Sequence, residues 1–300
     1  MHVVVAAPPV VATGLSLDGV ELVPWDGRGA PPREDITVWV PAYIVGRDAD
    51  DIAATLKQLP HLKVVQLLTA GVEPWPSLVG PDVTLCAGKT VHGGSTAELA
   101  VALTLALIRD LPAYVELQRK REWRREAPDT IIGRRVLILG AGDIGASAAT
   151  VFDALGADVT LSARTHHLPL HEAKHQLPET DVLLVALPLT DETRGLVDAT
   201  WLSKLPDRAI VVNVARGPIV DLDALTAEVS AGRLRAGLDV TDPEPLPSDH
   251  PLWQLPSALI TPHVGGGATG WESRARTLIE DQVARFTSGE PLRFVVESGY

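Results

Sequence analysis

The stretch RVLILGAGDIGASAATVFDALG, residues 135–156, decides the fold of this 300-residue chain. An apolar, strand-like run opens it, and Gly140, Gly142 and Gly145 then lead into a helical pattern that Gly156 ends. In such a turn the first glycine allows the sharp bend, the second lets the backbone approach a pyrophosphate, and the third lets helix and strand pack closely. The helix N-terminus then faces the anion. The stretch therefore predicts a dinucleotide-binding unit.

Around this stretch, strand-like runs alternate with helical ones along almost the whole chain. This alternation predicts the α/β class, with parallel sheets covered by helices. Six strand-like runs in the second part favour a doubly wound sheet there. The predicted strands are Val3 to Ala6, Val20 to Val23, Thr37 to Val40, Val64 to Leu68, Val83 to Cys86, Arg135 to Leu139, Val159 to Leu161, Val182 to Leu187, Ile210 to Val214, Ala236 to Val240 and Leu259 to Thr261.

Two glycine-rich segments, 93–94 and 265–267, mark the points where the chain is expected to cross between two domains. Glycine accommodates bends that other residues resist, so we expect a two-strand hinge with a cleft between the domains. The alternative is that these glycines only permit turns. The expected domains are 1–94 with 267–300, and 95–266.

A long helix is predicted to start at Ser95, whose hydroxyl fits a capping box with Glu98. Its body, LAVALTLALIRDL, is apolar on nearly every side. That pattern indicates burial in a core or against another subunit. We expect a homodimer through this helix, which begins near Thr96.

Composition narrows the classes of partner. A net charge of -12 disfavours nucleic acid or an anionic membrane, because both attract basic surfaces. The longest apolar stretch, Leu99 to Ile108, is far shorter than the roughly 20 residues of a membrane span. The single cysteine, Cys86, excludes an intrachain disulfide and suits a reducing compartment, and its VTLC context favours an inert core thiol. We expect a cytoplasmic protein.

Two local patterns could indicate other ligands. The basic run RKREWRR, 119–125, favours a solvated helix end with Trp123 packed underneath over a nucleic-acid patch. His167, His171 and His175 recur every four residues, as metal ligands on one helix face would. Pro169 interrupts that helix, so a polar loop near the adenosine end of a cofactor is favoured and no metal is expected.

Three polar residues each follow an apolar, strand-like run: Arg216 in VVNVARG, Glu244 in DPEP and His263 in TPHVGG. Arginine binds a carboxylate through two parallel hydrogen bonds, and histidine exchanges a proton near neutral pH. Glutamate can orient the imidazole and stabilise its charge. Downstream of a dinucleotide-binding turn, these residues predict a hydride-transfer site.

The strand VTLSAR ends in Ala163 and Arg164, where an NAD-binding enzyme places an acidic residue on the ribose 2′-hydroxyl. Arg164, helped by Ser162, Thr165 or His166, could pair with a 2′-phosphate that an aspartate would repel. The sequence therefore predicts NADP as the cofactor. NAD, bound loosely beside a solvated arginine, is the alternative.

From about Val64 to Ala268 the chain resembles the D-2-hydroxyacid dehydrogenase family. The family has a Rossmann nucleotide-binding domain inserted into a smaller flavodoxin-like substrate domain. After TAGV this sequence continues EPWPS, a departure that makes the substrate-side wall unusual. The matching segments are TAGV from Thr69, STAELAVALTLAL from Ser95, GAGDIG, LPLT from Leu187 with Thr193 following, VVNVARGPIVD, GLDV with DPEP, and TPHVGGG.

The resemblance implies that Arg216, Glu244 and His263 are catalytic and that Asp239 helps to position the nicotinamide. It also implies that the backbone amides of Ala70 and Gly71, together with Arg216, bind the substrate carboxylate. Besides the glycine turn and the region of Arg164, the expected cofactor contacts are Asp143, Ile144, Leu187, Pro188, Thr193, Val214, Ala215, His263 and Gly265.

Together these features predict an NADP-preferring reductase of small 2-keto acids to D-2-hydroxy acids, with glyoxylate and hydroxypyruvate as the first candidates. A nucleotide-sensing binding protein of the same fold, like the C-terminal-binding corepressors, is the alternative from another class. Phosphite or formate oxidation is a lesser alternative. Formate enzymes carry glutamine where Glu244 stands, and phosphite enzymes place a lysine near the carboxylate-binding loop, which TAGV does not provide.

Overall fold

The computed structural model describes residues 2–42, 48–164 and 167–296. The chain folds into two compact units, Met1–His92 with Gly267–Tyr300, and Gly93–Gly266. Thr165 and His166, expected near the cofactor, lie outside the described residues. Among the residues that are described, no helix combines the length and apolar character that a membrane crossing requires.

The first unit is built on a parallel sheet of five strands in the order β2-β1-β3-β4-β5. This is the strand order of flavodoxin-like sheets, and the structure confirms that part of the predicted fold. The strands are β1 (Val4–Ala7), β2 (Glu21–Pro24), β3 (Val38–Trp39), β4 (Val64–Gln66) and β5 (Thr84–Cys86), and the helices are α1 (Pro9–Ala12), α2 (Ala49–Lys57), η1 (Trp75–Ser77) and α9 (Trp271–Ser288).

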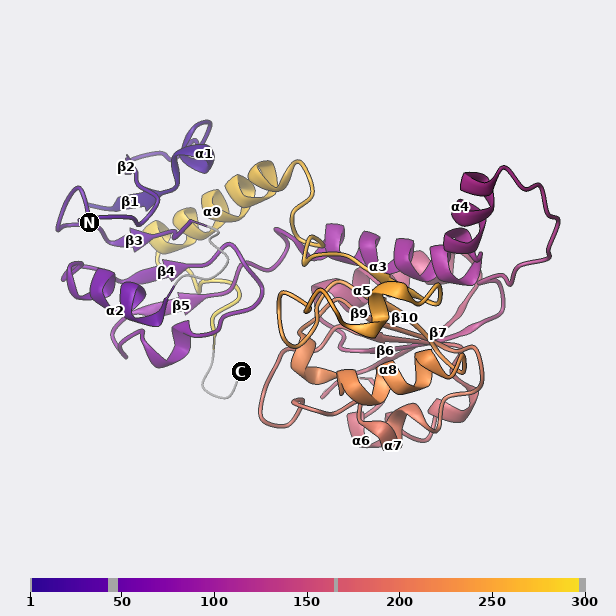
Figure 1. Cartoon of the computed structure of the whole chain (residues 1–300). Coiled ribbons are helices and arrows are strands. Elements are labelled where there is room, and N and C mark those ends of the chain that lie inside the picture. Colours follow the sequence, from indigo (N-terminus) through magenta and orange to yellow (C-terminus); the bar gives the residue numbers. More distant parts are fainter. Residues whose placement is uncertain (1, 43–47, 165–166, 297–300) are drawn as a thin grey trace. The chain divides into compact units, whose positions relative to one another are not determined.

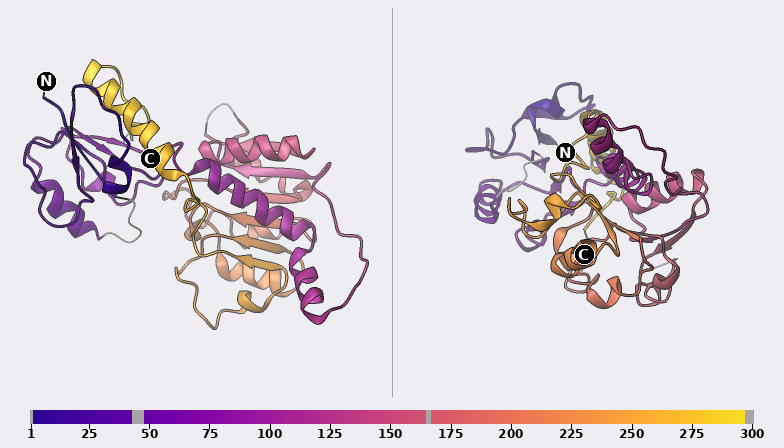
Figure 2. Two further views of the ribbon diagram at one scale, coloured as in Figure 1. Left: turned by 90° about the horizontal axis from the view of Figure 1, so that it is seen from above. Right: turned by 45° about the vertical axis from the view of Figure 1, so that its right-hand side comes forward.

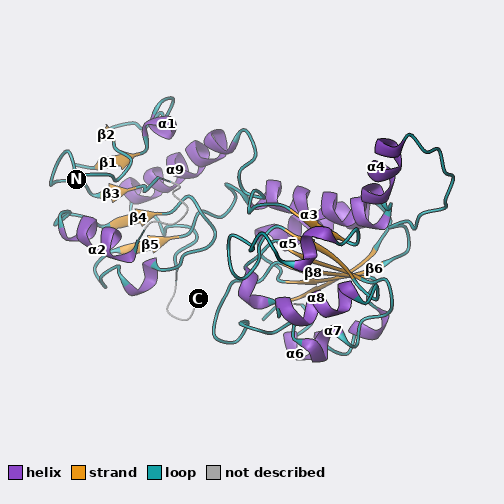
Figure 3. Ribbon diagram, in the orientation of Figure 1, coloured by secondary structure: helices purple, strands orange, loops and turns teal. Residues whose placement is uncertain are grey.

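Alternate side chains of these strands enter two separate cores, as the two-residue period of a strand requires. Val5 belongs to the core that α1 and α9 cover, and Val4 belongs to the opposite core, which α2 covers. Figure 3 shows α9 and α2 on opposite sides of this sheet. Three tryptophans, Trp25, Trp39 and Trp75, fill the second core, and the ring centroids of Trp39 and Trp75 lie 5.5 Å apart.

Cys86 ends β5 and is fully buried. Desolvation raises the pKa of its thiol to about 11, against an ordinary value of 9.0. Because the raised value keeps the thiol protonated, Cys86 is a poor nucleophile at neutral pH, in agreement with the inert core thiol that the sequence predicted. The protonated thiol stabilises the fold below about pH 9, and this contribution is lost as the pH rises towards 11.

The second unit is built on a parallel sheet of six strands in the order β11-β10-β9-β8-β6-β7. The strands lie within two residues of the predicted limits: β6 (Arg135–Leu139), β7 (Asp158–Ser162), β8 (Val182–Val185), β9 (Ile210–Asn213), β10 (Arg235–Leu238) and β11 (Ala258–Ile260). The helices are α3 (Gly93–Ile108), α4 (Leu111–Lys120), α5 (Asp143–Ala154), α6 (Leu170–Ala173), η2 (Leu177–Glu179), α7 (Ala199–Leu202), η3 (Gly217–Ile219), α8 (Leu222–Ser230) and η4 (Pro251–Gln254).

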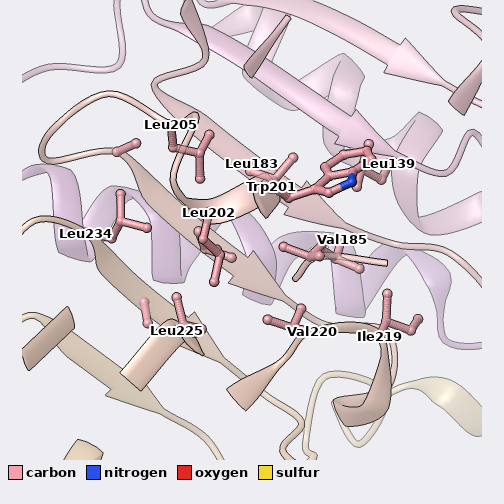
Figure 4. Packing of buried hydrophobic residues seen from close by; sticks show 14 of the residues in the cluster. Leu139, Leu183, Val185, Trp201, Leu202, Leu205, Ile219, Val220, Leu225 and Leu234 are labelled. Atoms are coloured by element: carbon pink, nitrogen blue, oxygen red, sulfur yellow. The ribbon is translucent and has the colours of Figure 1, made fainter. Parts of the chain in front are cut away.

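The sheet is doubly wound, with β7 on one side of β6 and β8 on the other. Val136 and Ile138 of β6 pack into the core beneath α3 and α5, whereas Leu137 and Leu139 pack into the core on the opposite face. Figure 4 shows the core of the second unit that contains Leu139, which lies near Trp201. Figure 1 shows α3 and α5 on one side of the sheet and α6, α7 and α8 on the other. Ligands of such sheets bind at the carboxyl ends of the strands beside the switch point, here next to β6.

Helix α3 begins at Gly93, two residues before the predicted start, so Ser95 is not its N-cap. The Asp143 carboxylate lies so close that a Cβ on Gly93 would be 1.8 Å from its Oδ2. A negative charge at a helix N-terminus is favourable, so this contact stabilises the first turn of α3. The apolar body of α3 packs on α5, β9 and β10, so most of its hydrophobic surface is covered within its own chain.

Helix α4 and the loop after it extend beyond the end of α3 (Figure 2) and contain the basic run. No residue of α4 is buried, and Trp123 is 90% exposed. The prediction that Trp123 packs beneath a helix end was wrong, because α4 already ends at Lys120 and the chain continues without a helix to pack on.

The three glycines of the β6–α5 turn have different surroundings. A Cβ on Gly145 would lie 1.8 Å from the Gly140 carbonyl oxygen, and a Cβ on Gly140 would lie 2.4 Å from the carbonyl oxygen of Ala186. Gly140 also has a φ of +109°, which side-chain-bearing residues rarely adopt. At Gly142 nothing lies within 4 Å of an added Cβ.

Gly145→Ala should therefore lower the free energy of unfolding by about 3 kcal/mol or more, because the methyl group overlaps a backbone oxygen that cannot move freely. Gly142→Ala is the matched control. It adds the same methyl group into open space and should cost about 1 kcal/mol or less. Urea unfolding followed by circular dichroism compares the two, and equal losses would contradict the packing described here.

Candidate active site

The turn between β6 and α5 has the form of a pyrophosphate site. Gly142 is the N-cap of the 12-residue helix α5, and among the described residues no side chain caps its N-terminus by a hydrogen bond. The space above Gly142 is open, whereas Gly140 and Gly145 are closely packed by backbone. A helix N-terminus with free approach to its backbone suits a phosphate. These residues therefore fit a dinucleotide, as the sequence predicted from the same three positions.

Asp143 and Ile144, predicted cofactor contacts, form the first turn of α5 and are half-buried. The side chain of Asp143 lies against Gly93 of α3. This contact joins the first turns of α3 and α5, and gives Asp143 a structural role that the sequence did not reveal.

The strand β7 ends at Ser162, and Arg164 follows it at the same edge of the sheet. Ser162 is fully buried, and its hydroxyl has no hydrogen-bond partner among the described residues. The Arg164 side chain is 63% exposed, and its Nη2 lies 3.5 Å from Oε2 of Glu192. Arg164 could be identified from the sequence but Glu192 could not, because no motif contains Glu192 and no local pattern pairs it with Arg164.

The loop after β8 contains Leu187, Pro188 and Thr193, three further predicted cofactor contacts. Leu187 is half-buried and Pro188 is exposed. The Thr193 hydroxyl accepts a hydrogen bond from the amide of Thr190 at 2.8 Å and donates one to the carbonyl of Pro188 at 2.6 Å. These bonds close the loop into a compact turn beside the glycine turn, since Gly140 packs on the backbone of Ala186.

Asp239 organises the segment that carries His263. Its carboxylate accepts hydrogen bonds from the Thr261 hydroxyl at 2.6 Å and from the amides of Val264 and Gly265, both at 2.9 Å. The backbone carbonyl of Asp239 accepts from the His263 amide at 2.8 Å. Asp239 is buried, and these bonds hold His263 in the left-handed region, with a φ of +53°.

His263 and Glu244 are in direct contact. The distance from His263 Nδ1 to Glu244 Oε2 is 2.9 Å, and Glu244 Oε1 accepts a hydrogen bond from the amide of Thr241 at 3.2 Å. Both side chains remain about one third exposed, 35% for His263 and 39% for Glu244. With Nδ1 directed at the carboxylate, Nε2 is the nitrogen that can exchange a proton with a ligand.

Arg216 follows β9 and precedes the short helix η3. The side chain of the buried Asn213 fixes this turn, donating to the Arg216 carbonyl at 3.0 Å and accepting from the amide of Ala215 at 3.0 Å. A Cβ on Gly217 would lie 1.9 Å from the Thr241 carbonyl oxygen, so the Arg216 turn packs on the loop that carries Glu244.

The guanidinium of Arg216 is half-buried and donates to the Ala215 carbonyl at 2.7 Å. Val214 and Ala215, predicted cofactor contacts, are buried beside it. Asn213 was missed by the sequence analysis, although VVNVARG contains it. A polar residue inside an otherwise apolar strand was the signal that could have identified it.

Ala70 and Gly71 belong to the first unit, where they follow β4 and are half-buried. The Thr69 hydroxyl donates to the Gly71 carbonyl at 2.7 Å, and the Gly88 amide donates to the Thr69 carbonyl. These bonds fix the backbone of the TAGV segment.

Gly265, another predicted cofactor contact, lies in the second unit, where a Cβ would be 3.1 Å from the Thr96 side chain.

No group of three His, Cys, Asp or Glu side chains within 2–42, 48–164 and 167–296 is arranged to hold a metal ion. His171 lies on the short helix α6 with its side chain 82% exposed.

Comparison with known proteins identifies the family. A family model for the D-isomer specific 2-hydroxyacid dehydrogenase, NAD binding domain, matches residues 101–265. The D-3-phosphoglycerate dehydrogenase of Mycobacterium tuberculosis is 33% identical over 289 residues, which cover 91% of this chain and 54% of that protein. The chain thus spans about half the length of this mycobacterial relative.

A glyoxylate/hydroxypyruvate reductase B from Pectobacterium atrosepticum is 34% identical over 227 residues, covering 70% of this chain and 71% of that protein. Among solved structures, the NADPH-dependent glyoxylate/hydroxypyruvate reductase of Sinorhizobium meliloti in complex with NADP and sulfate superimposes with a TM-score of 0.84. It is 28% identical and covers 100% of both chains. The chain belongs to the D-isomer specific 2-hydroxyacid dehydrogenase family.

Proposed function

We propose that the protein is an NADP-preferring reductase that converts small 2-keto acids into D-2-hydroxy acids, with glyoxylate and hydroxypyruvate as the first candidates. The hydrogen bond between His263 and Glu244 carries the proposal, because it provides an oriented proton donor at the same sheet edge as the glycine turn. The similarity to the reductases of Pectobacterium and Sinorhizobium supports the substrate class.

The chemistry of the proposed reaction is acid catalysis with charge stabilisation. When both imidazole nitrogens are protonated, Nδ1 donates to Glu244 and Nε2 passes its proton to the keto oxygen as that oxygen gains negative charge. Arg216 binds the substrate carboxylate and polarises the keto oxygen. The amides of Ala70 and Gly71 are proposed to bind the same carboxylate. A nicotinamide cofactor bound at the glycine turn would supply the hydride to the keto carbon.

The proposed preference for NADP rests on Arg164. No acidic residue occupies the end of β7, where Ser162, Ala163 and Arg164 follow one another. A guanidinium pairs with a 2′-phosphate through charge-assisted hydrogen bonds, which NAD lacks. The Sinorhizobium reductase, described as NADPH-dependent, supports this assignment.

Consumption of NADPH and NADH with a panel of 2-keto acids tests the function. Wild-type protein should turn over glyoxylate and hydroxypyruvate with NADPH at a lower KM than with NADH. Arg164→Gln should raise the KM for NADPH by about 10- to 100-fold, which corresponds to the loss of one charge-assisted hydrogen bond, and should change the KM for NADH by less than about threefold.

Equal changes in the KM for NADPH and the KM for NADH would contradict the role of Arg164 but would not contradict the reductase activity. Tight dinucleotide binding without turnover of any 2-keto acid would contradict the reductase and favour the nucleotide-sensing alternative.

We also propose a homodimer through the outer face of α3 together with α4. Leu99 and Leu105 of α3 are half-buried against the core of their own unit, whereas Leu111 and Val115 of α4 and Trp123 after it are exposed at 49%, 45% and 90%. Apolar side chains gathered in this way are typical of a protein interface.

Light scattering at micromolar concentration should give twice the chain mass of 31.9 kDa, and Trp123→Ser should shift the mass towards a single chain. A wild-type mass of one chain would remove the dimer proposal.

A further inference from the structure

We propose that Glu192 is a specificity-determining residue that weakens the preference for NADP by pairing with Arg164. The inference rests on the proposed function, since it concerns the same 2′-phosphate. The Arg164 Nη2 and the Glu192 Oε2 are 3.5 Å apart. No sequence pattern pairs these residues, which are separated along the chain by the whole of β8.

The position of the pair gives it this role. Arg164 follows β7 and Glu192 follows β8, and these two strands are the neighbours of β6 on its two sides. The ion pair therefore joins the loops on either side of the glycine turn that follows β6. A dinucleotide at the carboxyl end of β6 has its adenosine half in this region, so a 2′-phosphate and the Glu192 carboxylate are alternative partners of one guanidinium.

The loop holds Glu192 in place for this contact. Thr193, the next residue, is buried, and its hydroxyl is bonded to Thr190 and to Pro188. The backbone around Glu192 is thus fixed, and the Glu192 side chain itself is 79% exposed and free to meet a partner. Asp191, directly before it, is exposed and forms no ion pair among the described residues.

The charges determine the direction of the effect. A phosphate monoester carries a charge of about −1.5 to −2 at neutral pH, so it is repelled by a nearby carboxylate. The Glu192 carboxylate also competes with the phosphate for the guanidinium of Arg164. Both effects oppose NADP and neither acts on NAD, whose ribose carries a neutral hydroxyl. An exposed ion pair of this kind contributes little, so Glu192 reduces the preference and does not reverse it.

Binding of NADP⁺ and NAD⁺, measured by isothermal titration calorimetry at about 0.15 M ionic strength, tests the inference without any turnover. Glu192→Gln should bind NADP⁺ about two- to fivefold more tightly than wild type, with NAD⁺ affinity changed by less than about twofold. Asp191→Asn is the matched control, because it removes the same charge one residue away. Among the described residues Arg164 forms its ion pair with Glu192 and not with Asp191, so in this variant NADP⁺ affinity should change by less than about twofold.

A double-mutant cycle identifies the partner of Glu192. In an Arg164→Gln background, Glu192→Gln should increase NADP⁺ affinity less than it does in wild type, because the guanidinium is gone and only the repulsion between the carboxylate and the phosphate is relieved. The same gain in both backgrounds would overturn the inference. Unchanged NADP⁺ binding with weakened NAD⁺ binding would also overturn it, since Glu192 would then bind the ribose hydroxyl itself.

The outcomes separate this inference from the proposed function. Tight NADP⁺ binding that is equal in wild type and Glu192→Gln would overturn the inference and leave the reductase intact. The expected gain in a protein that reduces no 2-keto acid would support the inference and contradict the reductase. Failure of wild type and variants alike to bind NADP⁺ would overturn both.

Discussion

Asp239 accepts hydrogen bonds from the Thr261 hydroxyl and from the amides of Val264 and Gly265, and its backbone carbonyl accepts from His263. A left-handed backbone costs a residue other than glycine roughly 1–2 kcal/mol. Hydrogen bonds to a charged group contribute about 1.5–3 kcal/mol each, so the buried carboxylate outweighs that cost. The imidazole of His263 thereby reaches Glu244. The family resemblance implied that Asp239 helps to position the nicotinamide, and in the structure its carboxylate also holds the segment that carries His263.

Parallel strands explain why residues distant in sequence form one site. The glycine turn, Arg164, Arg216 and His263 follow β6, β7, β9 and β11, and all of these strands point in the same direction. Their carboxyl ends therefore lie along one edge of the second sheet, with the switch point beside β6. Close backbone packing at Gly140, Gly145 and Gly217 then fixes the loops at that edge. The site is thus a consequence of topology, completed by a few contacts that only glycine permits.

The strands of both units could be predicted from the sequence because buried parallel strands form short apolar runs, such as RVLIL at β6. His263 and Glu244 could be predicted because each follows such a run in a recognisable motif. The contact of Asp143 with the first turn of α3 could not, since these residues lie 50 positions apart along the chain. The exposure of Trp123 also could not be predicted, because the sequence pattern does not reveal that α4 ends at Lys120.

The partner of Arg164 also could not be predicted from the sequence. Its ion pair with Glu192 depends on the order of strands in the sheet, which local patterns do not specify. The hydrogen bonds of Asp239 could not be predicted for the same reason, because their donors Thr261, Val264 and Gly265 follow the neighbouring strand β11. Short motifs indicated which residues matter, and the tertiary contacts decided what those residues do.

The most direct test of the account is the turnover number of His263→Asn for glyoxylate with NADPH, measured together with the affinity of the variant for NADP⁺. Asparagine tolerates the left-handed backbone of position 263, so the loop around Asp239 should keep its shape. The account predicts a turnover about 100- to 10,000-fold below wild type, with NADP⁺ affinity changed by less than about threefold. A variant that keeps more than about a tenth of wild-type turnover would contradict the assignment of His263 as the proton donor.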